Sequence, residues 1–398
     1  MKYDVIVVGA GIVGLASALK ILEKNSALKL LILEKENGVA KHQTGNNSGV
    51  IHSGIYYKPG SLKAQNCVNG YRMLIEFCEK NNVRFNICGK VIVATSENEI
   101  PVMENIIKRG EQNGLKGVRR LNREGLKEIE PHTDGVAGVF VPQTGIIDYT
   151  EVSEKYLELI KLLGANIEFN CRVENIILQN DECEVVTNNG TFQSKTIVTC
   201  AGLFADRIAK ITHPDLPLRL VPFRGEYYKL KDEKKSLVNA LIYPVPNPAF
   251  PFLGVHFTRM IDGEVECGPN AVLSFKREGY KKTSFNLRDT IDTFTWSGFH
   301  SMIGNHWKMG LGEFYRSYNK KAFVKALSKL IPEIQEDHLI PGGSGVRAQA
   351  CMLDGSLLDD FYVVEDKRVI HVCNAPSPAA TASLSIGDFI SDKVLKKL

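Results

Sequence analysis

The chain of 398 residues has no apolar stretch as long as the ~18 residues that a membrane-spanning helix needs. Its nine cysteines include no Cys-x-x-Cys pair, so the sequence predicts neither a disulfide framework nor a bound metal. The first apolar run, Val5–Val8, breaks at Gly9 and no small-residue cleavage site follows it, so we expect no signal peptide. These absences favour a cytoplasmic protein.

Excess charge of one sign is also lacking. The 49 Lys and Arg against 45 Asp and Glu give a net charge of +4 at pH 7, without a long basic block, so we expect no nucleic-acid partner. The chain is 44% hydrophobic and 24% charged, which is the balance of a folded globular protein. Because one core stops growing at about 250–300 residues, the length predicts two domains.

A glycine-rich turn stands near the N-terminus. The run Lys2–Val8 is rich in strand-forming residues, and Val5–Val8 within it is apolar without alternation, which is typical of a strand buried on both faces of a parallel sheet. It leads into Gly9, Gly11 and Gly14 in G-x-G-x-x-G spacing, and then into the helix-forming segment Leu15–Leu22. In such a turn the first glycine allows a tight bend, the second lets the backbone approach a pyrophosphate, and the third lets the helix pack on the strand.

An acidic residue follows at the expected distance. A second apolar run, Leu28–Leu33, ends at Glu34, twenty residues after Gly14. A carboxylate here accepts hydrogen bonds from ribose hydroxyls and repels a 2′-phosphate, which disfavours NADP. Strand, turn, helix, strand and acid together predict a dinucleotide-binding domain, but this pattern does not separate FAD from NAD.

The segment 44–54 favours FAD. It is small, polar and glycine-rich, and it contains Asn47, Ser48 and His52. Such a loop can pass closely along an extended cofactor, where Asn47 and Ser48 can hydrogen-bond the phosphates or the ribityl chain. The composition also fits an ordinary surface loop.

Two further segments fit the same domain. Lys195–Gly202 is predicted to be a strand of the first sheet that ends in the small residues Ala201 and Gly202, and Val173 is placed to lie beside an adenine. Near the C-terminus, a strand enters a loop with Pro378, Ala379 and Ala380, and a helix follows. A helix N-terminus there favours the negative charge of a reduced flavin, although the pattern also fits a capped helix without a ligand.

Several long motifs are spread over nearly the whole chain: His52–Ala64 (HSGIYYKPGSLKA), Pro251–Thr258 (PFLGVHFT), Gly268–Tyr280 (GPNAVLSFKREGY), Gly345–Gln349 (GVRAQ) and Asn374–Ser383 (NAPSPAATAS). With the glycine turn, they resemble the D-amino-acid-oxidase-like flavoproteins and, more narrowly, the L-2-hydroxyglutarate oxidase/dehydrogenase family. One departure is Arg259, which stands where the family has Pro-Arg. The resemblance implies FAD-dependent oxidation of L-2-hydroxyglutarate to 2-oxoglutarate, with electrons passing to a membrane quinone or to oxygen.

Oxidation of a 2-hydroxy acid moves a hydride from Cα to flavin N5 while a base takes the hydroxyl proton. The base should titrate near neutrality, which favours histidine. The candidates are His52, in the loop expected beneath the flavin, and His256, in an alternating stretch. The residues leave the choice between them open.

A substrate with two carboxylates needs cationic or strong donor groups, and arginine binds carboxylates bidentately. Arg347, in a glycine-rich turn, is the first candidate, and Arg224, Arg259 and Tyr57 are further ones. Each of these side chains is equally typical of an ordinary surface ion pair.

We expect an α/β protein with a Rossmann-like FAD-binding domain and a second, substrate domain on a mostly antiparallel sheet. The FAD-binding domain is predicted to be discontinuous, from residues 1–85, 150–215 and 340–398. Residues 86–149 and 216–339 then form the substrate domain.

Both tryptophans fall within 283–318. Trp296, Phe299, Ile303 and Trp307 stand at the spacing of one helical face, with several basic residues nearby. This stripe fits packing on the substrate domain. It also fits a peripheral contact with the inner face of the cell membrane, through which a quinone would reach the flavin.

Three other functions remain open on these residues. The same fold serves FAD-dependent amino-acid or amine oxidases and glycerol-3-phosphate dehydrogenases. From a different class, a non-catalytic flavin-binding subunit that relays electrons would carry the same cofactor motifs.

Overall fold

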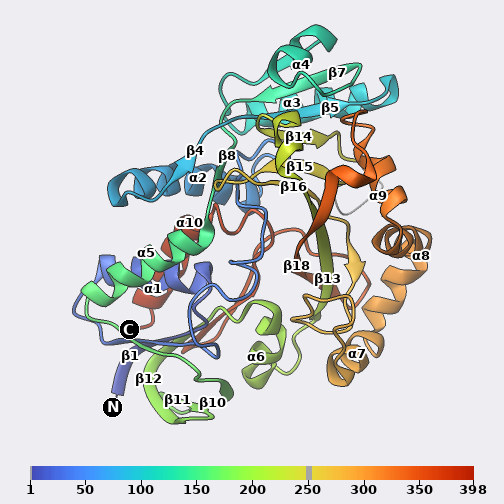
Figure 1. Ribbon diagram of the computed structural model, residues 1–398. Coiled ribbons are helices and arrows are strands. Elements are labelled where there is room, and N and C mark those ends of the chain that lie inside the picture. The colour runs from blue at the N-terminus through green and yellow to red at the C-terminus, as the bar shows by residue number, and fades with distance from the viewer. Residues whose placement is uncertain (1, 248–252) are drawn as a thin grey trace.

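The computed structural model describes residues 2–247 and 253–398, and two large sheets organise it (Figure 1). The first has a parallel centre, in the spatial order β9 (Asn166–Glu168), β2 (Leu30–Leu33), β1 (Lys2–Val8), β12 (Gly190–Thr199) and β20 (Val369–Asn374). β19 (Tyr362–Glu365) pairs with β20, and β10 (Val173–Leu178) pairs with β11 (Cys183–Thr187), which lies against β12; these pairs are antiparallel. Val5, Ile6 and Val7 are fully buried, as their unbroken apolar run predicts.

Helices cover this sheet. On one face α1 (Ile12–Lys24) packs against α10 (Ser383–Leu395) and α5 (Tyr149–Leu162), and α2 (Leu62–Asn81) packs against α10 (Figure 1). The approach of α1 and α10 is close, since a Cβ on Gly387 would lie 2.5 Å from the carbonyl oxygen of Ala16. The short η2 (Gly202–Phe204) and α6 (Ala205–Thr212) follow β12, and α6 contacts β10 and β20.

The second sheet is antiparallel except for one pair. Its order is β17 (Val272–Leu273), β13 (Leu218–Leu230), β16 (Val265–Gly268), β15 (His256–Arg259), β14 (Leu241–Pro244), β5 (Lys90–Ala94), β7 (Ala137–Val141) and β6 (Arg119–Leu121), with β18 (Leu339–Met352) also on β13. Only β14 and β5 are parallel neighbours among these described strands. A small sheet of β3 (Val50–Ile51), β8 (Gly145–Ile147) and β4 (Phe85–Asn86) shares no strand with either large sheet but packs on both, since Ile51 and Ile147 belong to the core of the first sheet and Val50 and Ile146 cluster with Leu241 and Tyr243 of β14.

The remaining helices accompany the second sheet: α3 (Ile100–Gln112), α4 (Arg123–Ile129), α7 (Leu287–Phe294), α8 (Ser297–Tyr318) and α9 (Lys320–Leu327), with the short η1 (Glu97–Glu99), η3 (Asp232–Leu237) and η4 (Glu336–His338). The predicted α/β class is confirmed: a Rossmann-like parallel sheet and a second, mostly antiparallel sheet. None of the helices within 2–247 and 253–398 combines the length and apolar character needed to cross a membrane.

The predicted strands of the second domain have counterparts, with one difference in sheet membership. β18 pairs with β13 along most of its length, so residues 340–352 lie in the second sheet, although the predicted boundary assigns them to the FAD-binding domain. The first two residues of the motif Pro251–Thr258 lie outside the described residues, and its last three begin β15. The division into two domains stays a prediction.

The predicted tryptophan stripe is divided. Trp296, just before α8, and Phe299 are buried in a cluster with Val221 and Cys351. Ile303 and Trp307, one and two turns farther along the helix, are 38% and 52% exposed. The first half of the stripe therefore packs on the second sheet, while the second half faces outward.

Candidate active site

A cavity of about 390 Å³ lies between the ends of β12 and β20 in the first sheet and the middle of β13 and β18 in the second. Its lining includes the start of α1, the loop before β3, the middle of β18 and the loop between β20 and α10, together with Lys63 of α2 and Gly225 and Tyr227 of β13. The predicted site residues that line it are Gly11, Gly14, Asn47, Ser48, His52, Gly202, Arg347, Pro378, Ala379 and Ala380. Tertiary structure thus brings together residues from positions 11 to 380.

The three glycines of the turn have different roles. Gly9 has φ of +103°, and a Cβ there would lie 2.4 Å from the carbonyl oxygen of Cys200. A Cβ on Gly14 would lie 2.0 Å from the carbonyl oxygen of Gly9, so this position allows the helix to pack on the turn. At Gly11 the nearest atom would be Thr44 Oγ1 at 3.4 Å, and the residue lines the cavity. The open side of Gly11 fits the close approach of a pyrophosphate.

The carboxylate of Glu34 stabilises this turn by accepting hydrogen bonds from backbone N–H groups. The donors are the backbone N–H of Ala10 at 2.7 Å and of Glu36 at 2.9 Å. The side chain is buried at the end of β2, beside the helix N-terminus, as the dinucleotide pattern predicts. Because each carboxylate oxygen can accept a further hydrogen bond, this arrangement fits a ribose.

Side-chain oxygens of the loop that contains Asn47 accept hydrogen bonds from the backbone of the loop and of the start of α1. Asn47 Oδ1 accepts from the backbone N–H of Gly49 at 2.8 Å, and the N–H of Ile12 donates to Thr44 Oγ1 at 3.1 Å. Asn47 and Ser48 both line the cavity, so the loop passes along the start of α1. Thr44 was not predicted as a site residue; a hydroxyl in a glycine-rich loop was the available signal.

The C-terminal loop closes the cavity from the other end. Thr381 lies just before α10, whose N-terminus has no side-chain cap. Thr381 Oγ1 accepts a hydrogen bond from the backbone N–H of His52 at 3.1 Å and lies 2.8 Å from the hydroxyl of Tyr149. The loop residues Pro378–Ala380 therefore have a fixed position relative to His52, and the uncapped helix N-terminus fits an anionic group.

Both histidine candidates are neutral at pH 7. Burial, followed by the nearby charges of Lys90 and Lys63, lowers the pKa of His52 to about 3. Burial likewise lowers the pKa of His256 to about 3. His52 lines the cavity, and its Nε2 lies 3.4 Å from Ser377 Oγ.

His256 has a different setting. Its Nδ1 lies 2.8 Å from the carbonyl oxygen of Gly254, so Nδ1 carries the proton and Nε2 is left as an acceptor. Its ring packs on that of Tyr243, with 3.9 Å between centroids. The side chain is buried and is not among the cavity-lining residues.

Other predicted residues lie outside the cavity lining. Ala201 stands between the lining residues Cys200 and Gly202, Gly9 begins the glycine turn, and Glu34 bonds to that turn through the N–H of Ala10. Val173 is buried at the start of β10. Tyr57 contacts cavity residues from outside, since its hydroxyl bonds to Ser377 and Lys63 Nζ lies 4.9 Å from its ring centre.

Two of the predicted arginines have structural partners instead. The guanidinium of Arg224 is buried, donates to Glu226 Oε1 at 2.8 Å and to the carbonyl oxygen of Lys281 at 3.0 Å. Arg259 donates to the carbonyl oxygen of Val238 at 3.1 Å. Neither lines the cavity, whereas Arg347 does. Arg347 is thus the candidate from the sequence that the fold places with His52.

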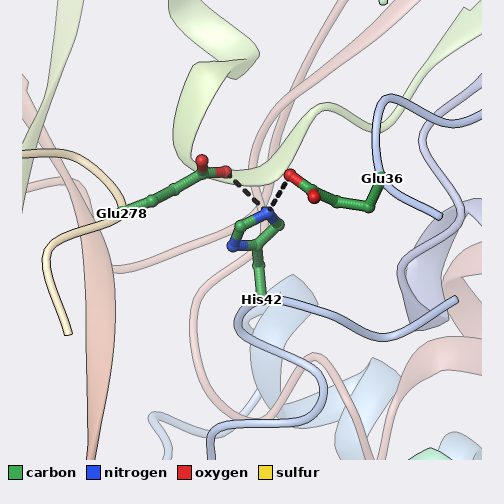
Figure 2. Close-up of side chains that lie close together, drawn as sticks. All are labelled: Glu36, His42 and Glu278. Atoms are coloured by element: carbon green, nitrogen blue, oxygen red, sulfur yellow. Dashed lines mark hydrogen bonds and ion pairs between the residues drawn. The ribbon is translucent and has the colours of Figure 1, made fainter. Parts of the chain in front are cut away.

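A cluster of charged side chains lies near Glu34 (Figure 2). His42 Nε2 lies 2.9 Å from Glu36 Oε1 and 3.0 Å from Glu278 Oε1, a spacing that would suit a metal ion. The ammonium of Lys35 is in the same place, 2.8 Å from Glu278 Oε1 and 2.8 Å from His42 Nε2. Because this cation already pairs with the carboxylates, we interpret the cluster as an ion-pair link between the loop after β2 and the segment that carries Glu278.

Comparisons with known proteins agree with this architecture. The model of the FAD dependent oxidoreductase family matches residues 4–393. An L-2-hydroxyglutarate dehydrogenase of Indibacter alkaliphilus is 54% identical over 398 residues, covering 100% of both chains. The mitochondrial L-2-hydroxyglutarate dehydrogenase of Homo sapiens is 42% identical and covers 100% of this chain and 89% of the human one.

Among solved structures, the fold is similar to an L-alpha-glycerophosphate oxidase from Mycoplasma pneumoniae with FAD bound, with a TM-score of 0.81 and 22% identity, covering 100% of this chain and 95% of that one. The predicted family resemblance and the predicted cofactor, FAD, are confirmed. The glycine turn, Glu34 and the two uncapped helix starts around the cavity fit that cofactor. The chain belongs to the FAD-dependent oxidoreductase family, together with the L-2-hydroxyglutarate dehydrogenases.

Proposed function

We propose that this protein oxidises L-2-hydroxyglutarate to 2-oxoglutarate. The observation that carries the proposal is 54% identity over the whole chain to a protein named for this activity. His52 and Arg347 support it, because a histidine and an arginine in one cavity are what a 2-hydroxy acid needs.

FAD would be held by the backbone at Gly11, the start of α1, Glu34, and the loops of Ser48 and Ala379. When bound, it supplies the two-electron acceptor for the hydride that leaves the substrate's C2. The chain's own residues have to fix the substrate and remove the hydroxyl proton.

We assign the proton transfer to His52. It lines the cavity, and its imidazole is unprotonated at pH 7, as a base has to be before the reaction, although burial lowers its pKa and so makes it a weaker base than an ordinary histidine. The hydrogen bond from its backbone to Thr381 fixes the base relative to the loop before α10. His256, with Nε2 as an acceptor, is the second candidate.

Arg347 would bind the carboxylate next to the reacting carbon. It follows Gly345 and Val346 on β18, and all three line the cavity with His52. A guanidinium fork holds a planar carboxylate in one orientation, which in turn orients the hydroxyl towards the base. Tyr57 is placed to support this region through Ser377.

We further propose that the electrons pass to a quinone or to oxygen, and that α8 contacts the inner face of the cell membrane. Ile303, Trp307 and Leu311 stand four residues apart on α8 and are 38%, 52% and 61% exposed. Lys308, with its ammonium 5.6 Å from the Trp307 ring centre, adds a positive charge. An apolar helix face with basic neighbours is typical of an interfacial helix.

The direct test is anaerobic mixing of the purified holoprotein with L-2-hydroxyglutarate, its D-isomer or L-lactate, while the flavin absorbance near ~450 nm is followed. Bleaching by the L-dicarboxylate alone is the expected result. A flavin that is bleached by glycerol 3-phosphate or an amine instead would establish one of the alternative activities. A flavin that no donor bleaches would indicate an electron-relay subunit.

A further inference from the structure

Lys90 is a charged residue in an apolar strand. It opens β5, of which every residue from Lys90 to Ala94 is buried, and it is itself 1% exposed. Its Nζ lies 4.4 Å from the ring centre of Tyr56 and 4.9 Å from that of Tyr243. The amine is thus held between two aromatic rings.

This amine has no anionic partner in residues 2–247 and 253–398. No carboxylate lies within ion-pair distance, and no oxygen accepts a hydrogen bond from Nζ. The other nearby lysine differs in this respect, because Lys63 Nζ lies 2.7 Å from Asp359 Oδ1. Charges buried without a partner are rare in proteins, because the cost of removing them from water is high, and they are typical of functional positions.

A second polar group next to Lys90 is also unpaired. The Tyr56 hydroxyl is buried and has no hydrogen-bond partner within the part of the chain that the structure describes. Most buried hydroxyls are hydrogen-bonded, so an ammonium and a hydroxyl that both lack a partner indicate a missing acceptor.

The surroundings connect this pair with the active site. Tyr243, one of the rings around Nζ, packs on His256. The charge of Lys90 is also close enough to His52 and His256 to disfavour their protonation. The missing acceptor would therefore belong to a molecule in the active site.

We propose that Lys90, assisted by the Tyr56 hydroxyl, binds the carboxylate of the substrate that is remote from the reacting carbon. This inference rests on the proposed oxidation of a dicarboxylate and deepens it, with Arg347 for one carboxylate and Lys90 for the other. Since Lys90 does not line the cavity, Nζ has to move out from between the rings, which the flexible four-carbon side chain allows.

A pH dependence follows from the same geometry. Burial lowers the pKa of Lys90 to about 7 in the free protein. The groups that face it are neutral at this pH: burial raises the pKa values of Cys67, Tyr56 and Tyr243 and lowers those of His52 and His256. Binding strength should therefore fall as the pH rises above about 7, when Lys90 loses its proton.

The experiment compares two substrates that differ only at the remote end, L-2-hydroxyglutarate and L-2-hydroxyvalerate, in the wild type, Lys90→Met and Lys90→Arg. For Lys90→Met we expect kcat/KM to fall about a hundredfold with the dicarboxylate, and less than about threefold with the valerate. Tyr56→Phe should reduce only the dicarboxylate value, by about fivefold. Equal losses on both substrates, or no loss on either, would overturn the proposal.

The pH profile gives an independent readout. In the wild type, kcat/KM for the dicarboxylate should fall about tenfold per pH unit above about pH 7, and the valerate profile should not show this decline. Lys90→Arg should abolish the decline, because a guanidinium keeps its proton. A decline of the same size with valerate would contradict the assignment.

Two controls separate the possible failures. Flavin content and melting temperature show whether the variants fold. If they do not, the proposal is tested on the wild type alone, by measuring the binding of glutarate, which has both carboxylates but lacks the hydroxyl. Glutarate should perturb the flavin spectrum, with an affinity that falls above about pH 7, whereas pentanoate should show no such pH dependence. A wild type that binds glutarate in this way but is not bleached by L-2-hydroxyglutarate would refute the proposed function and not the carboxylate site.

Discussion

The backbone N–H of His52 donates a 3.1 Å hydrogen bond to Thr381 Oγ1, which joins two loops that are 329 residues apart in the sequence. The same Oγ1 lies 2.8 Å from the hydroxyl of Tyr149 at the start of α5. The candidate base and the loop before α10 therefore share one buried anchor.

Thr381→Val should remove this anchor without changing the shape of the side chain. It leaves the N–H of His52 unpaired, at a cost of about 1–3 kcal/mol in stability. Displacement of the base should lower kcat by about ten- to a hundredfold. Thr381→Ser, which keeps the hydroxyl, is the matched control. Equal kcat values for the two variants would show that the anchor does not position His52.

The glycines of the turn should respond differently to the same substitution. Gly14→Ala places a Cβ 2.0 Å from the carbonyl oxygen of Gly9, so we expect protein that does not fold. Gly11→Ala meets only Thr44 Oγ1 at 3.4 Å and should fold, but its methyl group faces the cavity and should block FAD. Flavin absorbance per mole of folded protein is the measurement. A fully loaded Gly11→Ala protein would place the pyrophosphate elsewhere.

The acid side of the pH profile tests the histidines. Burial lowers the pKa values of His52 and His256 to about 3, so a histidine base stays unprotonated at lower pH than an ordinary imidazole of pKa ~6.5. We expect kcat/KM to stay level between about pH 5 and pH 7. In His52→Ala, kcat should fall by about 10²–10⁴-fold, and in His256→Ala it should fall less. The reverse order would assign the base to His256.

A buried ion pair connects α6 with the second sheet's loops. The Arg277 guanidinium donates to Asp206 Oδ2 at 2.8 Å and to the carbonyl oxygen of Leu203 at 2.7 Å, and both charged side chains are at most 3% exposed. Asp206→Asn should lower the free energy of unfolding by about 3–5 kcal/mol, because it leaves a buried charge uncompensated. Urea denaturation measures the effect. The exposed pair Arg123–Asp134 is the control, since Asp134→Asn should cost less than about 1 kcal/mol.

The exposed apolar face of α8 predicts that the protein binds to phospholipid membranes. Trp307→Ala/Leu311→Ala should weaken binding to anionic phospholipid vesicles by about tenfold or more, since each side chain loses apolar area. Bleaching of the flavin by the substrate should not change. Leu162→Ala, at a 76% exposed leucine of α5, is the matched control. Binding that survives in the double variant would exclude α8 as the contact. Trp296, which is buried, is unsuitable for this test.

The sequence by itself determined the dinucleotide-binding unit. Its signals are local: an apolar run for β1, a G-x-G-x-x-G turn whose first glycine has φ of +103°, and Glu34 directly after the next strand. Such features depend on residues that are neighbours in the chain, so their pattern predicts a dinucleotide-binding fold. The choice of FAD over NAD rested on the segment 44–54 and on the family resemblance. The strings around His52 and Arg347 marked the two residues that the fold then brings into one cavity.

Only the tertiary structure decided where the charged and aromatic residues lie relative to the cavity. Arg224 lies beside Glu226 and Lys281, and Trp296 and Trp307 have opposite exposures. Lys90, at the start of an ordinary apolar strand, lies buried without an anionic partner among the described residues. In each case the surroundings of the side chain include segments that are distant in the sequence, such as Lys281 beside Arg224 and Tyr243 beside Lys90. The role of a charge depends on its burial and on the groups that face it, and both are set by packing between strands and helices that the local sequence does not specify.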